Sequence, residues 1–506
     1  MTPTEEIHQN SKEFDRLKAQ GSLTESACLT FARRAAELTI EHFEAEGRLL
    51  REAIDLLCRL ATSEDRQAAR AGIQGLFPEL IERLNDSFNP AYCRLYDQLF
   101  AQVTEFCRRL PEANRLNEAL IRFGLHNEDD LLRRKSQIPN LNSQLPNLAS
   151  FNSVKKVLLP SRVTIGADVA VTSVLIAKLR RALPQAEFVI LGSPKLRELY
   201  GGDSRIRIRE IAYERGGTLL SRLMSWLKVV EVVRDEQRNL QEDELWIVDP
   251  DSRLTQLGLL PLVENDRNYF FFESRSYQAA SATSIGQLAA HWAGELIGDT
   301  EPVYPFVALP KEHQEFGQAV ANQIRNFVTV SFGVGGNERK RVSEEFEEEL
   351  IVRLSADAKL ILDKGASREE REQINRIVNA MRAEGKTVIE LDESNKAELI
   401  NEDLQQADIV TWDGGIGAFA GLAAAGNQYI GYDSAGQHIA AALGVPTLTF
   451  FVNANNAAFA ERWRPTGVGR IEVVKVDATQ LAAPLKLSDL ILTQVPAAHG
   501  RLKAGD

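Results

Sequence analysis

Residues 428–446 read QYIGYDSAGQHIAAALGVP, and this segment indicates the fold most clearly. The aromatic and β-branched residues 428–432 predict a strand. Ser434, followed three positions later by Gln437, predicts a capping box ahead of an apolar helical run. The segment therefore predicts a strand that leads directly into a helix, as in parallel α/β sheets.

The start of this helix has the chemistry of an anion site. A helix N-terminus offers unpaired backbone N–H groups and a partial positive charge, and the small residues Ala435 and Gly436 allow a phosphate to approach the backbone closely. His438, one turn further on, can add a donor from its ring. The alternative interpretation is a capped helix with a satisfied histidine and no ligand.

Length and composition narrow the class of protein. At 506 residues the chain exceeds a single hydrophobic core, so two or three domains are expected. Its net charge of -12 argues against a nucleic-acid binder. The four cysteines suggest neither a disulfide framework nor a zinc site. Neither a leader nor an apolar spanning run is evident, so we expect a cytoplasmic protein.

Three regions follow from the pattern along the chain. Residues 1–150 read as an all-helical module and a Ser/Asn/Pro-rich linker at 135–153. Residues 151–304 and 305–506 each alternate short apolar runs with helical patterns, which predicts two Rossmann-like α/β domains. We expect the helical module to serve as an appendage for packing or oligomerisation.

Twelve strands are expected in the two α/β regions. Their ranges are 155–159, 187–191, 205–211, 245–248, 269–272, 327–332, 359–362, 387–391, 408–411, 428–432, 447–451 and 471–476. Ligands of such sheets bind beyond the carboxyl ends of the strands, so the residues that follow each strand are the candidates for function.

Two of these positions carry ionisable groups suited to catalysis and phosphate binding. Asp168 follows the first α/β strand at a helix start, where its alternative role is a capping carboxylate. After the strand at 327–332, the stretch GVGGNERKR combines a glycine turn with cations that could hold a diphosphate. A solvated basic face is the alternative. The candidates in this stretch are Gly335, Gly336, Asn337, Lys340 and Arg341.

Together these residues resemble glycosyltransferase family 9, the heptosyltransferases of bacterial lipopolysaccharide assembly, which have the two-domain GT-B fold. The resemblance covers roughly residues 155–476 and excludes the helical module. DSAGQH followed by IAAALG, at 433–444, resembles the family's D-[ST]-G-x-x-H-x-A-A-A-L-G signature for the donor diphosphate. The stretch from Asp168 resembles the segment carrying the family's proposed general base, and Lys340 and Arg341 resemble its phosphate-binding pair.

The sequence departs from the family pattern at three places. An extra residue, Ala167, separates Gly166 from Asp168. Ala435 stands where the family usually has glycine, and VS at 342–343 replaces the usual Trp-Pro. These departures bear on the donor sugar and are compatible with a degenerate or specialised member.

The resemblance implies an inverting, metal-independent transfer of a sugar from a nucleotide-diphosphate sugar. Asp168 would act as the base, while Lys340 or Arg341 and the segment Ser434–His438 would hold the diphosphate. Asp433, Asp251 and Arg253 are further candidates for the cleft. The triplet Asp249-Pro250-Asp251 matches the D-x-D pattern of metal-dependent transferases, but we expect neither a metal nor another cofactor.

The partners expected from this reading are an ADP-heptose-like donor and a glycan or lipid-linked glycan acceptor. The protein would act in the cytoplasm or at the inner face of the membrane, with the helical module as a route to oligomers. Two alternatives remain: a non-catalytic GT-B-like binding or scaffold protein with a vestigial site, and a nucleotide-sugar epimerase of the same fold.

Overall fold

The computed structural model describes residues 2–138, 151–213, 217–280, 282–396, 404–452, 457–477 and 498. The chain forms two compact units. The first contains Met1–Val163 and Arg209–Gln278, and the second contains Thr164–Ile208 and Ala279–Asp506. Most of the linker expected at 135–153 lies outside the described residues, as does most of the chain after residue 477.

The first unit begins with a series of helices. The second of these helices, Glu25–Glu46, shows the apolar spacing of an amphipathic helix. Its residues Cys28, Phe31, Ala35 and Leu38 recur at steps of three and four and are all buried. The principal helices are α1 Pro3–Ala19, α2 Glu25–Glu46, α3 Arg51–Ala61, α4 Arg66–Gln74, α5 Glu82–Asp86, α6 Pro90–Cys107, α7 Asn114–Arg122 and α8 Glu128–Gln137. Whether these helices form a domain of their own stays a prediction. The four cysteines are free thiols.

All twelve strands expected from the sequence are present. A five-stranded sheet has the order β3-β2-β1-β4-β5. Its strands are β1 Lys156–Pro160, β2 Glu187–Gly192, β3 Ile206–Glu210, β4 Leu245–Asp249 and β5 Tyr269–Phe271. In the first unit β1 pairs with β4 and β4 with β5, both in parallel, with Lys156 opposite Leu245 and Ile247 opposite Tyr269. Helix α12, Leu219–Gln237, belongs to the same unit.

The second unit contains a seven-stranded sheet with the order β12-β11-β10-β6-β7-β9-β8. Its strands are β6 Phe327–Ser331, β7 Lys359–Asp363, β8 Val388–Asp392, β9 Ile409–Asp413, β10 Gln428–Tyr432, β11 Thr447–Val452 and β12 Ile471–Val476. Every pairing in this sheet is parallel. The sheets are thus those of an α/β protein, as predicted.

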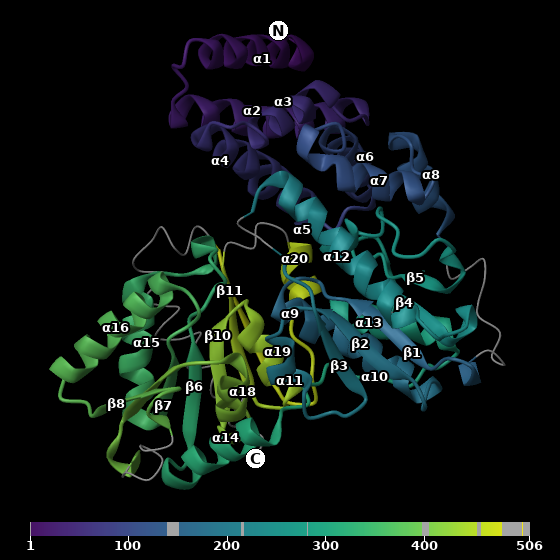
Figure 1. Cartoon of the computed structure of the whole chain (residues 1–506). Coiled ribbons are helices and arrows are strands. Elements are labelled where there is room, and N and C mark those ends of the chain that lie inside the picture. The colour runs from purple at the N-terminus through teal and green to yellow at the C-terminus, as the bar shows by residue number, and fades with distance from the viewer. Residues whose placement is uncertain are drawn as a thin grey trace. The chain divides into compact units, whose positions relative to one another are not determined.

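The strand order of the larger sheet reverses between β6 and β10. From β6 the chain adds β7 on one side, whereas β10 begins the run of β11 and β12 on the other. Ser331 pairs with Gly431, so the carboxyl ends of β6 and β10 lie side by side (Figure 1). A reversal of this kind is where open α/β sheets bind ligands.

Helices cover both faces of the larger sheet. Helices α15 and α16 contribute Phe346, Leu350 and Ile374 to a core that includes Val328 and Ile430. On the other face, α14, α18 and α19 pack with Phe327, Ile361 and Tyr429. The helices of the second unit are α9 Ile165–Ala167, α10 Ser173–Ala182, α11 Leu196–Tyr200, α13 Ile285–Ile297, α14 Lys311–Gln323, α15 Glu344–Asp357, α16 Arg368–Ala383, α18 Ile416–Ala425, α19 Ala435–Ala442 and α20 Ala457–Trp463.

Two glycines set the close approach of α14 and α18. A Cβ on Gly317 would lie 2.0 Å from the Gly421 carbonyl oxygen, and a Cβ on Gly421 would lie 2.0 Å from the His313 carbonyl oxygen. No side chain fits between these backbones, so the helices pack directly through their glycines. None of the helices in the described part of the chain is long and apolar enough to cross a bilayer.

We expect Gly421→Ala to lower the free energy of unfolding by about 2–3 kcal/mol, because the added methyl group forces the two helices apart. Chemical denaturation measures this loss. Asn322→Ala, on the exposed surface of α14, is the control and should change stability by less than about 0.5 kcal/mol. Equal stability of Gly421→Ala and the wild type would contradict the packing described.

Candidate functional site

An ion pair joins the segments that follow β6 and β10. The Lys340 ammonium donates to Asp433 Oδ2 at 2.6 Å and to the Asp433 carbonyl oxygen at 3.2 Å. It also lies 5.5 Å from the centre of the Phe459 ring. The Lys340 side chain remains 28% exposed, whereas that of Asp433 is 8% exposed. The ammonium is therefore held at the strand ends and stays accessible to an anion.

His438 lies in a buried network behind this pair. Gln437 Nε2 donates to Asp433 Oδ1 at 2.8 Å and lies 3.3 Å from His438 Nε2, while Thr449 Oγ1 donates to Gln437 Oε1 at 2.7 Å. Burial lowers the pKa of His438 to about 4, since the nearby Asp433 carboxylate only partly offsets burial and the Lys340 ammonium adds to it. His438 is thus neutral at pH 7 and would serve as a hydrogen-bonding group rather than a cation.

The predicted capping box does not form at the start of α19. Ser434 has an extended backbone, with φ -151°, and its side chain makes no capping hydrogen bond. The Gln437 amide, which the box requires, bonds Asp433 and Thr449 instead. This prediction was wrong because buried polar partners outcompete the local backbone for the amide. The first turn of α19 is left without a cap from Ser434.

Gly436 is small for a reason that the sequence did not reveal. A Cβ at Gly436 would lie 2.3 Å from the hydroxyl oxygen of Tyr429, and a Cβ at Gly431 would lie equally close to it. The two glycines therefore make room for a tyrosine on β10. Ala435, the neighbouring residue, has an intermediate exposure.

Arg341 faces a different partner from Lys340. Its guanidinium forms a bidentate pair with Glu347, donating from Nε at 2.9 Å and also from Nη2. Glu347 is completely buried and accepts further hydrogen bonds from the Tyr432 hydroxyl at 2.9 Å and from Gln373. Burial raises the pKa of Glu347, and the pair with Arg341 opposes that rise. In this structure Arg341 thus joins the segment after β6 to α15, and Glu347 in turn joins α15 to β10 through Tyr432.

Asp168 lies one turn inside a helix rather than at its cap. The cap of α9 is Thr164, and the helix runs on through Asp168–Thr172 into α10. The capping role considered for Asp168 is therefore wrong. Its carboxylate, 1% exposed, accepts a hydrogen bond from Thr172 Oγ1 at 2.9 Å.

The Asp168 segment packs against the start of α19 within the second unit. A Cβ at Gly166 would lie 3.1 Å from Cα of Ala435 and 3.3 Å from Cδ2 of His438. The absence of a side chain at Gly166 lets the two helix starts approach this closely. The structure thus brings the predicted base-bearing segment and the predicted diphosphate-binding helix together.

The glycine turn after β6 is open to solvent. Gly335 and Gly336 have φ of 63° and 83°, and a Cβ at either would meet nothing within 4 Å. Their conformation, rather than a close contact, requires glycine there. The Asn337 side chain accepts a hydrogen bond from the Arg339 backbone N–H at 3.2 Å and so begins the short helical turn that carries Lys340.

The remaining cleft candidates, Asp251 and Arg253, belong to the first unit. Asp251 accepts a hydrogen bond from Ser274 Oγ at 2.5 Å and pairs with Arg275. Arg253 begins a short helical turn after Ser252 and is partly exposed.

The other carboxylate of the D-x-D triplet is also engaged by protein donors. Asp249 is completely buried and accepts hydrogen bonds from Thr255 at 2.6 Å, from Tyr269 at 2.7 Å and from the Ser252 N–H at 2.7 Å. Burial raises its pKa to about 6. Among the described residues, no group of three or more His, Cys, Asp or Glu side chains is arranged to hold a metal ion.

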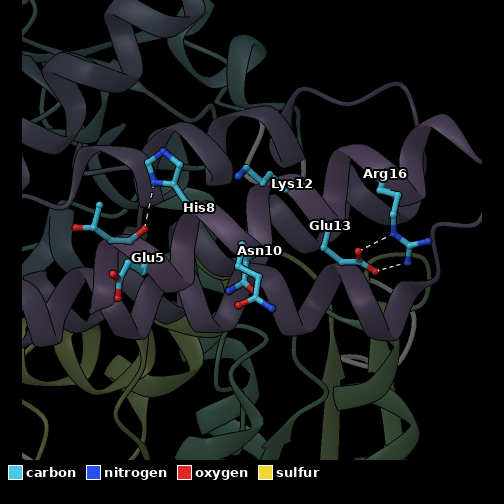
Figure 2. A pocket seen from close by; sticks show the side chains of 8 residues that line it. Glu5, His8, Asn10, Lys12, Glu13 and Arg16 are labelled. Atoms are coloured by element: carbon cyan, nitrogen blue, oxygen red, sulfur yellow. Dashed lines mark hydrogen bonds and ion pairs between the residues drawn. The ribbon is translucent and has the colours of Figure 1, made fainter. Parts of the chain in front are cut away.

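A further hollow lies on the surface of α1 in the first unit (Figure 2). Its charged groups pair locally: Arg16 Nε donates to Glu13 at 2.7 Å, and His8 Nδ1 lies 3.2 Å from the Thr4 carbonyl oxygen. None of the residues singled out from the sequence lines it. The site at α19 remains the stronger candidate.

Comparison with known proteins gave matches among solved structures. No family model matches the chain, and no curated protein matches it. A glycosyltransferase family 9 protein from Veillonella parvula is similar over 69% of this chain and 97% of its own, with 14% identity and a TM-score of 0.47. The ADP-heptose lipopolysaccharide heptosyltransferase II of E. coli is similar over 69% of this chain and 100% of its own, with 14% identity and a TM-score of 0.44.

A third similar structure is an E. coli heptosyltransferase solved with ADP, which has 14% identity, a TM-score of 0.43 and coverage of 69% of this chain and 99% of its own. The first of these structures is described as a glycosyltransferase family 9 protein, and the other two are described as heptosyltransferases.

Three residues of the site were not predicted from the sequence. Tyr429 and Glu347 lie on buried faces, and nothing in their local pattern distinguishes them from ordinary core and helix-surface positions. Thr449 lies within an apolar strand run, where a hydroxyl among apolar residues was an available signal of a buried polar partner.

We expect His438 to make stability depend on pH. Its folded pKa of about 4 lies below the ordinary value of 6.5, so the unfolded chain binds a proton between these values that the folded chain does not. The free energy of unfolding should therefore fall by up to about 1.4 kcal/mol for each pH unit between 6.5 and 4 through this group alone. Above pH 6.5 it contributes no slope.

Denaturation across pH measures this effect. His438→Gln should show a shallower loss of stability between pH 6.5 and 4 than the wild type. His291→Gln, which changes a histidine side chain 39% exposed, is the control and should keep the wild-type slope. An unchanged slope in His438→Gln would show that His438 titrates normally.

Proposed function

We propose that the chain is an inverting, metal-independent glycosyltransferase that moves a sugar from a nucleotide-diphosphate sugar to a glycan acceptor. The observation that carries the proposal is the arrangement around α19. An accessible Lys340 ammonium and an uncapped helix start lie at the reversal of the sheet, and the Asp168 segment packs on the same helix start.

The chemistry follows from the charges that change during transfer. The bond between the sugar and the diphosphate breaks, so negative charge develops on the leaving phosphate. Lys340 and the backbone N–H groups at the start of α19 would stabilise that charge. The acceptor hydroxyl attacks the anomeric carbon from the opposite face and transfers its proton to Asp168. Thr172 would fix the orientation of the Asp168 carboxylate.

Protein groups offer a substitute for a metal in this scheme. Lys340 supplies a cation at the diphosphate, and the D-x-D carboxylates Asp249 and Asp251 already accept hydrogen bonds from serine, threonine, tyrosine and arginine side chains. We therefore expect transfer to persist in excess chelator.

The proposal also extends to the donor, the acceptor, the cellular location and the domains. The donor would be similar to ADP-heptose, and the acceptor would be a glycan or lipid-linked glycan of lipopolysaccharide assembly. The protein would work in the cytoplasm or at the inner face of the membrane. Residues 151–304 would form the acceptor-side domain and 305–506 the donor-side domain of a GT-B protein, with residues 1–150 as a helical module available for oligomerisation.

One observation favours a second candidate, a binding or scaffold protein with a vestigial nucleotide-sugar site. Arg341, expected to bind phosphate, is paired with the buried Glu347, which leaves Lys340 as the cation joined to the start of α19. Titration of the full chain with nucleoside diphosphates separates the two: a vestigial site binds none of them.

We expect Asp168→Asn to lower the rate of sugar transfer by about 10²–10⁴-fold while leaving donor affinity nearly unchanged, because the amide cannot accept the acceptor proton. The measurement is product formation with a panel of ADP-, UDP- and GDP-sugars, with donor affinity determined by titration. Asp357→Asn, at the exposed end of α15, is the control and should keep wild-type turnover.

Undiminished transfer by Asp168→Asn would remove Asp168 from the mechanism. Conversion of a nucleotide sugar in the absence of any acceptor would instead support an epimerase.

A further inference from the structure

The hydroxyl of Tyr429 is buried without a hydrogen bond. Tyr429 lies on β10, is 0% exposed, and its hydroxyl oxygen has no partner in the structure. Leaving such a group unsatisfied costs about 1–3 kcal/mol. Phenylalanine would fill the same space without that cost, so the hydroxyl calls for a reason other than stability.

Its position places it under the start of α19. The hydroxyl oxygen lies 2.3 Å from where a Cβ would stand on Gly431 and on Gly436. The pairing of β10 with β6 ends at Gly431, which lies opposite Ser331. Gly436 lies in the first turn of α19. The hydroxyl therefore lies between the carboxyl ends of β6 and β10 and the helix start proposed to bind the diphosphate.

Two other hydroxyls lie near that of Tyr429. Burial raises the pKa of Tyr429, and interactions with the Ser434 and Ser331 side chains oppose that rise. Ser331 Oγ donates its proton to Asp363 Oδ2 at 2.9 Å. Ser434 makes no capping hydrogen bond, so its side chain is not committed to the backbone of its own helix. The Tyr429 hydroxyl is thus a buried donor close to the start of α19, where Ser434 does not cap the helix.

We propose that Tyr429 is a positioning residue of the diphosphate site and acts through Ser434. When a diphosphate occupies the start of α19, Ser434 donates its hydroxyl proton to a phosphate oxygen, and Tyr429 donates its own to Ser434 Oγ. The charge on the phosphate strengthens the first bond and, through it, the second. This inference rests on the proposed function, because it concerns the same diphosphate.

The test variant is Tyr429→Phe in the full-length chain, titrated calorimetrically with inorganic pyrophosphate, ADP, UDP and GDP. Affinity for pyrophosphate and for the nucleoside diphosphate that the wild type binds should fall by about tenfold. Without the Tyr429 hydroxyl, the hydrogen bond from Ser434 to the charged phosphate is weakened. The melting temperature should stay the same or rise, because an unsatisfied buried hydroxyl is removed. A purely structural role for the hydroxyl predicts the reverse pattern.

A double substitution tests the path through Ser434. If Tyr429 acts through Ser434, Tyr429→Phe should cause little further loss of affinity when Ser434→Ala is already present. The control is Tyr269→Phe in the first unit, where the lost hydroxyl donates to Asp249 at 2.7 Å. That variant should melt at a lower temperature and keep the wild-type affinity for pyrophosphate.

The outcomes separate this inference from the function on which it rests. If the wild type binds a diphosphate and Tyr429→Phe binds it equally well, the inference is overturned and the proposed function stands. Fully additive losses in the double variant would also overturn it. If the wild type binds neither pyrophosphate nor any of the nucleoside diphosphates, the proposed function fails and the inference fails with it.

Discussion

The site depends on the parallel pairing of β6 with β10 at the point where the strand order reverses. That pairing places the ends of two strands that are far apart in the sequence beside each other, and the Lys340–Asp433 ion pair joins the segments that leave them. Without the reversal, helices and loops would cover both strand ends. With it, a cation and an uncapped helix start share one edge of the sheet.

Most polar groups near that edge satisfy one another, and this decides which remain available. Gln437 is held by Asp433 and Thr449, and Arg341 by Glu347. These contacts stabilise the fold and leave little freedom for their side chains. Two groups differ from these. The Lys340 side chain is still partly exposed, and the buried hydroxyl of Tyr429 has no hydrogen-bond partner. A buried polar group without a partner calls for a specific explanation, and binding of a ligand is one such explanation.

The strands were predictable from the sequence because parallel strands buried on both faces read as short apolar runs. The approach of the Asp168 segment to α19 was expected from the positions of both after their strands. The capping box at Ser434 and the capping role of Asp168 were wrong. Each of these two predictions depended on the local position of one side chain. In the folded chain, Gln437 bonds Thr449 instead of capping its helix, and the helix that contains Asp168 already begins after Thr164. The Arg341–Glu347 pair and the glycines around Tyr429 likewise depend on tertiary packing that local patterns do not encode.

The most direct test of this account is a crystal structure of the chain with a bound nucleoside diphosphate. We predict that the β-phosphate lies within hydrogen-bond distance of Lys340 Nζ, the Ser434 hydroxyl and the first backbone N–H groups of α19, with the Asp168 carboxylate facing the same space. A diphosphate bound elsewhere, with the start of α19 left empty, would contradict it.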